Sequence, residues 1–314
     1  MRTRIAVTLG DPRGIGPEVA FQAVARDAPS GVDITFFGSD TLRPQLPGGC
    51  DFESVGTFDG SEESAGSVSA LAIQRAVERA VGGEYRALVT APVSKPALRA
   101  AGHDVPGQTE LLRQLTGCRR VGMLMAAERT RLGPALRVLL ATTHHALRDV
   151  PELVTEDLLA GQAPLLSAAL QRDWGIAEPR LALCALNPHA SDGGLFGDEE
   201  ARVLEPAVRR AVSAGVDLSG PLPADTVFQR ALAGHFDAVI APYHDVGMAV
   251  FKTVSFGSGV NVTLGLPFIR TSPDHGTAFD IARTGRANPS SMCEALRLAQ
   301  QLASTRFDTD SADV

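Results

Sequence analysis

Three histidines occupy similar positions in the sequence, each directly after a short apolar segment with the β-branched character of a buried strand. They are His144, His189 and His244. Ligands of open α/β sheets bind at the carboxyl edge of the strands, so the three imidazoles are expected to converge there. Three imidazoles with an open fourth position are typical of a catalytic site for zinc or cobalt. The alternative for each histidine is a local hydrogen bond at a strand end.

Two carboxylates are placed to orient a ligating imidazole through its second nitrogen. Asp245 directly follows His244, and Asp225 lies in the segment Gly-Pro-Leu-Pro-Ala-Asp-Thr at 220–226. Asp225 is equally well explained as an acidic residue in the first turn of the following helix, where the helix dipole favours it. Both interpretations of Asp225 stay open.

Two basic side chains and an amide stand in the apolar, glycine-rich stretch 251–271, namely Lys252, Arg270 and Asn261. Arginine binds phosphate or carboxylate through two parallel hydrogen bonds, and lysine adds a point charge. The stretch therefore predicts a binding site for an anion. The alternative is that both basic side chains extend to solvent.

The elements that must position these residues alternate between short apolar runs and longer helical patterns. Buried strands are predicted at 5–9, 87–90, 121–126, 136–143, 181–186 and 237–241. Helices are predicted at 65–81, 155–173, 198–214 and 224–233. This alternation indicates an α/β fold with a mostly parallel sheet. The length of 314 residues suggests two lobes.

The composition excludes several classes of protein. The chain has 29 Lys and Arg against 36 Asp and Glu, a formal charge of −7, which disfavours general binding to nucleic acid or anionic membranes. No apolar run reaches the roughly 18 residues of a transmembrane helix, and the amino terminus does not resemble a signal peptide, so a cytoplasmic protein is expected. The glycines Gly14 and Gly16 after the first strand lack the third glycine of a Rossmann fingerprint.

Several segments together resemble the 4-hydroxythreonine-4-phosphate dehydrogenase (PdxA) family. They follow one another in the family's order, and they are Gly-Asp-Pro-Arg-Gly-Ile-Gly-Pro-Glu at 10–18, Ala-Pro-Val-Ser-Lys at 91–95, Leu-Asn-Pro-His-Ala at 186–190, the segment 220–226, Tyr-His-Asp at 243–245 and the block 257–278. The residues from 274 to 289 are also similar to the cofactor loop of isopropylmalate and isocitrate dehydrogenases.

The resemblance implies a two-lobed, non-Rossmann α/β/α fold of the isocitrate/isopropylmalate dehydrogenase type, with a cleft between the lobes. A cofactor-side lobe would comprise 1–100 and 262–314. A central lobe, 101–261, would carry most metal ligands and the dimer contacts. The family also implies a homodimer with its active site at the subunit interface.

The resemblance further implies roles for individual residues. NAD or NADP would be bound by Asp274, His275, Gly276, Thr277, Ala278, Asp280 and Asn288. The substrate would contact Gln108, Thr109, Lys252, Asn261 and Arg270. One divalent ion, zinc, cobalt or magnesium, would be held by His144, His189 and His244. The candidates for proton transfer are Lys95, Asp225 and Asp245.

The implied reaction oxidises 4-phosphohydroxy-L-threonine to a β-keto acid, which loses carbon dioxide to give 3-amino-2-oxopropyl phosphate in pyridoxal phosphate biosynthesis. Two positions depart from the family pattern, because Gln108 replaces a usual histidine and Val246 a usual glutamine. They suggest as an alternative a related dehydrogenase of threonate or erythronate 4-phosphate, or of a terephthalate cis-dihydrodiol. A zinc hydrolase and a metal-binding fold without catalysis are alternatives of other classes.

Overall fold

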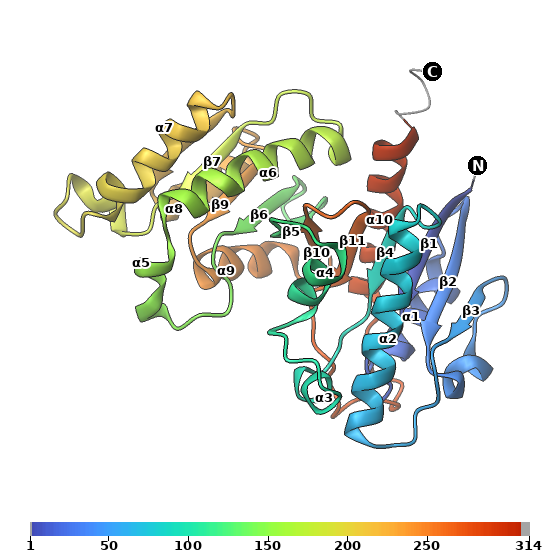
Figure 1. The fold of residues 1–314 in the computed structure, drawn as a ribbon. Coiled ribbons are helices and arrows are strands. Elements are labelled where there is room, and N and C mark those ends of the chain that lie inside the picture. Colours follow the sequence, from blue (N-terminus) through green and yellow to red (C-terminus); the bar gives the residue numbers. More distant parts are fainter. Residues whose placement is uncertain (1, 309–314) are drawn as a thin grey trace. The chain divides into compact units, whose positions relative to one another are not determined.

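The computed structural model describes residues 2–308 and divides the chain into two compact units (Figure 1). Unit 1 is formed by Met1–Val121 together with Val260–Val314, and unit 2 by Gly122–Gly259. The chain therefore leaves unit 1 after its first third and returns to it for the last strands and helix. The segment 101–121, expected in the central lobe, groups with unit 1.

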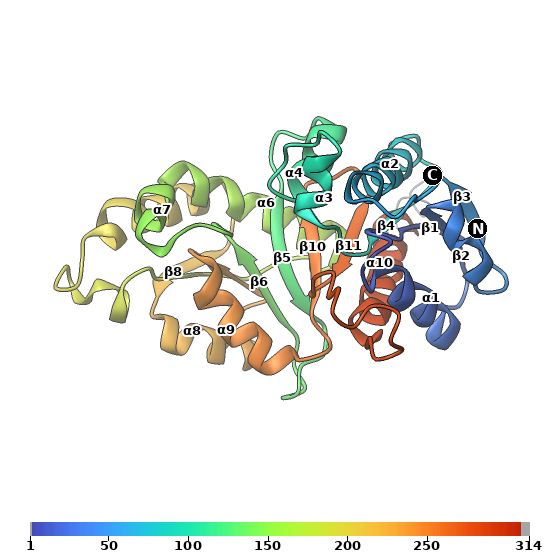
Figure 2. The same ribbon diagram turned by 90° about the horizontal axis from the view of Figure 1, so that it is seen from below.

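Unit 1 is a sheet covered by helices on both faces. Its strands are β1 (Thr3–Thr8), β2 (Val32–Gly38), β3 (Asp51–Ser54), β4 (Ala87–Thr90), β10 (Val260–Leu264) and β11 (Ile269–Pro273). They lie in the order β3-β2-β1-β4-β11-β10, and β10 is antiparallel to β11 while the other pairs are parallel. Its helices are α1 (Gly16–Asp27), α2 (Glu62–Val81), α3 (Lys95–Ala100), α4 (Gln108–Thr116), α10 (Ser290–Asp308) and the 3-10 turn η1 (Asp40–Gln45). Figure 2 shows α2 on one face of this sheet and α1 with α10 on the other.

Unit 2 has the same layered construction. Its strands are β5 (Gly122–Ala127), β6 (Leu136–Leu140), β7 (Leu181–Cys184), β8 (Leu218–Leu222) and β9 (Ala238–Ala241), in the order β5-β6-β9-β7-β8. Its helices are α5 (Val150–Leu153), α6 (Glu156–Trp174), α7 (Glu205–Ser213), α8 (Ala224–Leu232) and α9 (His244–Ser255). Short turns occur at η2 (Leu147–Asp149), η3 (Pro188–Asp192) and η4 (Glu200–Leu204), the last a π-helical turn. Helices α6 and α7 cover one face, and α8 and α9 the other (Figure 2).

The predicted α/β fold is confirmed, and each predicted strand corresponds to an observed one, namely β1, β4, β5, β6, β7 and β9. The predicted helices correspond to α2, α6, α7 and α8. The sheet pairs are mostly parallel, but β5–β6 and β10–β11 are antiparallel hairpins. No helix within residues 2–308 combines the length and the hydropathy needed to cross a bilayer.

Hydrogen bonds at the helix starts show how the sequence fixes these boundaries. The Ser61 hydroxyl accepts a hydrogen bond from the Ser64 amide at the start of α2, and Thr155 does the same for Leu158 at the start of α6. Each cap satisfies an amide that the helix itself leaves unpaired. Buried apolar side chains of α2 then pack on β1, β2 and β4 to form the core on that face of unit 1.

Candidate functional site

A pocket in unit 2 brings two of the three predicted histidines together. It has a volume of about 220 Å³ and is lined by Thr143, His144, His145, Leu147, Val150, Tyr243, His244 and Asp245. The ring centroids of His144 and His244 are 5.4 Å apart. Strands β6 and β9 are parallel neighbours that pair Leu140 with Ala241, so the loops that follow them leave the sheet at the same edge. The Thr142 hydroxyl ties these loops together by donating to the carbonyl oxygen of Pro242 at 2.8 Å.

The imidazole of His244 is oriented by its neighbour in the sequence. Asp245 Oδ1 lies 2.7 Å from His244 Nδ1. A carboxylate in this position favours the tautomer with the proton on Nδ1 and leaves Nε2 with its lone pair available to a metal ion. The donor set of this pocket, two imidazoles with one carboxylate behind, therefore fits a borderline divalent ion such as zinc or cobalt.

His189 lies in the same unit but does not line this pocket. It follows β7 in a turn where His189, Ala190, Ser191 and Asp192 have φ values of 52°, 54°, 63° and 47°. Left-handed backbone costs a non-glycine residue about 1–2 kcal/mol, so a run of four needs support from its surroundings. The His189 ring meets the Phe196 ring edge-on at 6.4 Å. Within residues 2–308, no three His, Cys, Asp or Glu side chains of one chain are grouped to hold a metal ion.

The guanidinium of Arg270 forms the centre of a second site, in unit 1. Arg270 lies in β11 and is only 2% exposed. Its Nη1 donates to Thr263 Oγ1 at 2.9 Å and its Nη2 to Thr90 Oγ1 at 2.6 Å. Its buried Nε has no hydrogen-bond acceptor in the described part of the chain. Burial lowers the pKa of Arg270 to about 10, and the nearby Glu110 carboxylate opposes this shift. The side chain is therefore charged at neutral pH.

The start of α4 borders this guanidinium. Gln108 Oε1 accepts from Arg270 Nη2 at 3.4 Å, and Gln108 Nε2 donates to the Ala91 carbonyl oxygen at 3.1 Å. Thr109, in the first turn of α4, is half-buried. Buried cationic nitrogen and the positive end of a helix dipole both favour an anion.

The structure divides the other predicted substrate residues between the units. Asn261 lies in β10 of unit 1, and its buried Oδ1 has no hydrogen-bond partner in residues 2–308. Lys252 lies in α9 of unit 2 and is half-buried. Lys95, predicted as a proton-transfer residue rather than a substrate contact, begins α3 and is exposed, and a Cβ on Gly107 would lie 3.8 Å from its Cε. Lys95 is therefore close to the start of α4.

Asp225 occupies the exposed first turn of α8. It lines an open, mainly apolar groove with Phe228 and Val250, and it is not among the residues that line the histidine pocket. This position agrees with the explanation of Asp225 as a first-turn residue, which the sequence left open.

The predicted cofactor residues belong to the loop 274–288, which packs on the glycine-rich loop after β1. The Ile15 amide donates to the Thr277 carbonyl oxygen at 2.9 Å, and a Cβ on Gly14 would lie only 2.7 Å from that oxygen. His275 Nδ1 lies 3.0 Å from the Gly276 carbonyl oxygen, and its buried Nε2 has no partner in residues 2–308. The close approach of the Thr277 carbonyl oxygen explains why position 14 is glycine.

Both ends of the loop are anchored to helix α10. The Asp274 amide donates to Ser291 Oγ at 3.1 Å, and Asn288 Oδ1 accepts from the Ser290 amide at 3.0 Å. Ala278 has a left-handed φ of 42°, and Asp280 is exposed. Asn288 therefore has a structural role at the start of α10.

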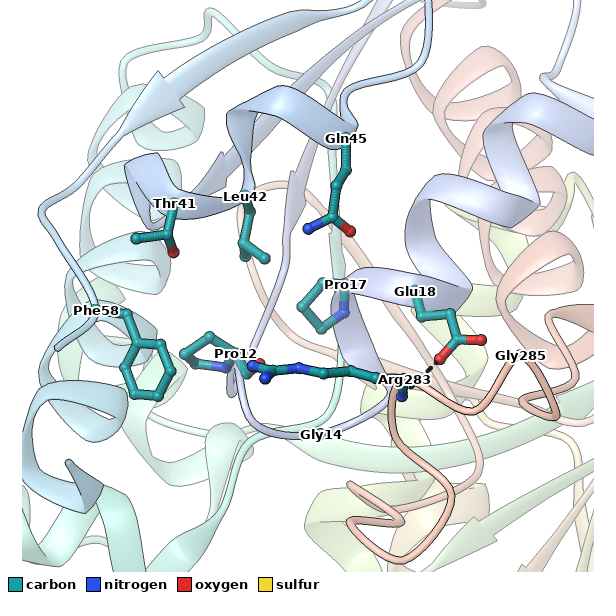
Figure 3. A pocket seen from close by; sticks show the side chains of 10 residues that line it. All are labelled: Pro12, Gly14, Pro17, Glu18, Thr41, Leu42, Gln45, Phe58, Arg283 and Gly285. Atoms are coloured by element: carbon teal, nitrogen blue, oxygen red, sulfur yellow. Dashed lines mark hydrogen bonds between the residues drawn. The ribbon is translucent and has the colours of Figure 1, made fainter. Parts of the chain in front are cut away.

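A cavity of about 430 Å³ lies beside this loop in unit 1 (Figure 3). Its lining residues are Pro12, Gly14, Pro17, Glu18, Thr41, Leu42, Gln45, Phe58, Arg283 and Gly285. Figure 3 shows Arg283 extended along the cavity, and its amide donates to Glu18 Oε2 at 3.2 Å. Sequence reasoning did not select Arg283 or η1, because nothing in their residue types marks a site.

The two threonines that contact Arg270 were also missed. Thr90 ends β4 immediately before the Ala-Pro-Val-Ser-Lys segment, and Thr263 lies two residues after Asn261. Their positions next to segments that resemble the family could have marked both threonines as candidate site residues. A buried arginine in a strand needs nearby acceptors, and threonine hydroxyls on adjacent strands can supply them.

Comparison with known proteins places these sites in context. The family profile described as "Pyridoxal phosphate biosynthetic protein PdxA" matches residues 32–299. The 4-hydroxythreonine-4-phosphate dehydrogenase of Paracoccus denitrificans is 41% identical over 96% of this chain and 98% of that protein. The D-threonate 4-phosphate dehydrogenase of Salmonella typhimurium is 39% identical over 95% of this chain and 98% of that protein.

Solved structures agree with this likeness. The crystal structure of 4-hydroxythreonine-4-phosphate dehydrogenase from Klebsiella pneumoniae has a TM-score of 0.86 at 37% identity, covering 96% of this chain and 99% of that one. An isocitrate dehydrogenase from Methylococcus capsulatus has a TM-score of 0.57 at 14% identity, covering 99% of this chain and 88% of that one. The second likeness concerns the fold alone, and it confirms the expected fold class.

Proposed function

This chain belongs to the PdxA family of pyridoxal phosphate biosynthetic proteins, and we propose that it oxidises 4-phosphohydroxy-L-threonine with NAD or NADP. The expected product is a β-keto acid that loses carbon dioxide to give 3-amino-2-oxopropyl phosphate. Family membership favours an oxidoreductase over the hydrolase and the non-catalytic fold that the sequence alone left open.

The buried Arg270 guanidinium is the observation that carries this proposal. It is held by two neutral hydroxyls, those of Thr263 and Thr90, and its Nε lacks an acceptor in residues 2–308. A buried cation without a bound carboxylate is costly unless an anion joins it. A phosphate beside the start of α4 would accept from Arg270 and from the Thr109 hydroxyl. The phosphate of the proposed substrate fits this requirement.

The histidine pocket is proposed to hold one divalent ion. His144 and His244 supply imidazole donors, and Asp245 fixes the ring of His244. When bound, such an ion supplies Lewis-acid stabilisation of negative charge on substrate oxygen, and the nicotinamide accepts hydride. The exposed amine of Lys95 is the proposed proton-transfer group, because it lies at the start of α3 close to Gly107. Asp245 acts on His244 rather than on the substrate.

The cofactor is proposed to bind along the loop 274–288. The unpartnered His275 Nε2 offers a hydrogen bond to a ligand, and the adjoining cavity is large enough for part of a dinucleotide. The choice between NAD and NADP stays a prediction, as does the cytoplasmic location.

The active enzyme is proposed to be a homodimer whose metal site is completed by a second copy of the chain. His144, His189 and His244 are not grouped within the described part of one chain, so a second copy would supply the third imidazole. An open groove lined by Leu132, Pro134, Phe228, Leu232 and Val250 also presents apolar surface, with Leu132 66% exposed. Leu132→Lys should weaken the dimer, which size-exclusion chromatography with light scattering would detect.

The reaction is tested by following NAD(P)H formation at 340 nm with 4-phosphohydroxy-L-threonine and Zn²⁺, Co²⁺ or Mg²⁺ in turn. Turnover that requires both the phosphate group and the metal supports the proposal. Turnover of a non-phosphorylated diol acid, without turnover of the phosphorylated substrate, would reject it.

A second candidate is oxidation of D-threonate 4-phosphate, and Gln108 favours it. The family's usual histidine carries a titratable ring at this position, whereas the Gln108 amide bridges Arg270 and the Ala91 carbonyl oxygen without charge. The 39% identity to a D-threonate 4-phosphate dehydrogenase supports the same candidate. Comparing kcat/KM for the two substrates in wild type and in Gln108→His decides between them. A wild-type preference for D-threonate 4-phosphate that reverses in the variant supports the second candidate.

A further inference from the structure

The turn that carries His189 has a backbone conformation that must be imposed by its surroundings. His189 to Asp192 all have left-handed φ values, although none of these residues is glycine. Only a well-determined environment keeps such a conformation. The residues that supply this environment therefore control where the His189 imidazole lies.

Glu200 provides the principal contacts to the chain just before this turn. It lies in the π-helical turn η4, and it is 2% exposed. Its Oε1 accepts from the amides of Leu186 at 2.9 Å and Asn187 at 2.7 Å, and its Oε2 accepts from Asn187 Nδ2 at 2.8 Å. All these donors precede His189 by two or three residues. In residues 2–308 no basic side chain forms an ion pair with Glu200, so these N–H groups are the compensation for its buried charge.

The segment 193–199, between the turn and η4, packs closely around the side chain of Asn187. Glu199 Oε2 also accepts from Asn187 Nδ2, at 2.7 Å. Gly197 has a φ of 126°, and a Cβ there would lie 2.6 Å from Glu199 Oε2 and 2.7 Å from Asn187 Nδ2. Phe196, one residue earlier, places its ring against the His189 imidazole. The chain thus returns over Asn187, next to the turn that carries His189.

We infer that Glu200 is a positioning residue for His189, holding the backbone before the left-handed turn so that the imidazole is presented to the divalent ion. This inference rests on the metal role proposed for His189. An apolar residue of similar size would leave the amides of Leu186 and Asn187 without this acceptor, so the buried carboxylate serves to hold the chain before the turn. Its hydrogen bonds are charge-assisted and directed at backbone amides, which makes them suited to fixing a loop.

The test is Glu200→Gln in the full-length chain, with Co²⁺ binding to the metal-free protein followed by visible absorption. Glutamine keeps the size of the side chain but places an NH₂ group against N–H donors. Removal of such outer contacts typically weakens metal binding about 10- to 100-fold. We expect an apparent Kd for Co²⁺ raised by about this factor and an altered absorption spectrum. Glu205→Gln, at an exposed glutamate that begins α7, should leave both unchanged.

Two further variants keep the result decisive. Glu200→Asp retains the charge and should bind Co²⁺ more tightly than Glu200→Gln. If circular dichroism shows that Glu200→Gln is unfolded, Glu200→Asp is compared with wild type in its place. His189→Ala separates this inference from the proposed function. If His189→Ala binds Co²⁺ as wild type does, the metal role itself fails. If His189→Ala loses Co²⁺ while a folded Glu200 variant binds it normally, or loses only thermal stability, the positioning role of Glu200 is overturned.

Discussion

At the scale of single residues, the proposals for this chain depend on two buried charges that form no ion pair within residues 2–308. Arg270 is held by hydroxyls, and Glu200 by amides. The sequence identified Arg270, because a basic residue in an apolar stretch needs an explanation. It did not identify Glu200, because Asp198-Glu199-Glu200 agreed equally well with the acidic start of a helix. Only Glu200 of these three carboxylates is buried, because it accepts hydrogen bonds from the amides that follow β7. That contact is set by the tertiary fold and not by the local sequence.

Arg270→Lys should weaken binding of the phosphorylated substrate. Lysine keeps the charge but cannot contact Thr90, Thr263 and a phosphate oxygen from one planar group. Charge-assisted hydrogen bonds contribute about 1.5–3 kcal/mol, so we expect kcat/KM to fall roughly 10- to 150-fold, mainly through KM. Steady-state kinetics with the phosphorylated substrate measures this. Arg113→Lys, on the exposed last turn of α4, is the control, and an unchanged KM in Arg270→Lys would contradict the phosphate role.

At the scale of elements, the sequence predicted the parts whose burial shows in a continuous apolar pattern. The strands that became β4, β7 and β9 are fully buried and were found within a few residues of their ends. No helix or strand was predicted in the stretch 251–271, yet it contains the end of α9, all of β10 and the start of β11. Its glycines belong to the turns between these elements, and that distinction depends on pairing with β4, which is distant in sequence.

Helices α2 and α3 pack closely because position 66 is glycine. A Cβ there would lie 1.9 Å from the Ala97 carbonyl oxygen and 2.5 Å from its carbonyl carbon. Gly66→Ala must therefore separate α3 from α2 and displace Lys95, which begins α3. Overpacking typically costs about 1–3 kcal/mol, and we expect a loss of this size in the free energy of unfolding, measured in urea. Gly82→Ala, at the end of α2 with ordinary contacts, is the control. Equal stability of the two variants would show that the helices are not closely packed.

The start of α2 should make stability depend on pH in the acid range. Hydrogen bonds from Ser64 and Ser61 lower the pKa of Asp59 from 3.8 to about 2. The unfolded chain therefore binds a proton at higher pH than the folded chain, and this stabilisation is present above about pH 4 and lost as the pH falls towards 2. Asp59→Asn should be less stable than wild type at pH 6, with a smaller difference at pH 3. Urea unfolding at both pH values measures it, and a difference that does not shrink at pH 3 would contradict the shift.

At the scale of the whole molecule, the connectivity of the chain explains how distant segments meet at the proposed anion site. Unit 2 interrupts unit 1, and the chain returns at Val260 to add β11 beside β4. The register pairs Arg270 with Leu88, which brings the guanidinium to Thr90 across 180 residues of sequence. Sequence reasoning placed Arg270 and Gln108 in one site through family resemblance. Their contact at 3.4 Å follows from this return of the chain.

The same scale decides whether the metal site requires two copies of the chain. His144 and His244 share a pocket within one chain, whereas His189 lies outside it. If a second copy supplies His189, mixing His189→Ala with His244→Ala subunits creates heterodimers in which one of two sites has all three imidazoles. Random exchange of inactive parents should then restore about a quarter of wild-type activity and Co²⁺ binding. Mixing His144→Ala with His244→Ala should restore nothing, because these two side chains belong to the same pocket. Recovery in neither mixture, with exchange verified by mass spectrometry, would place all three histidines in one chain and overturn the shared site.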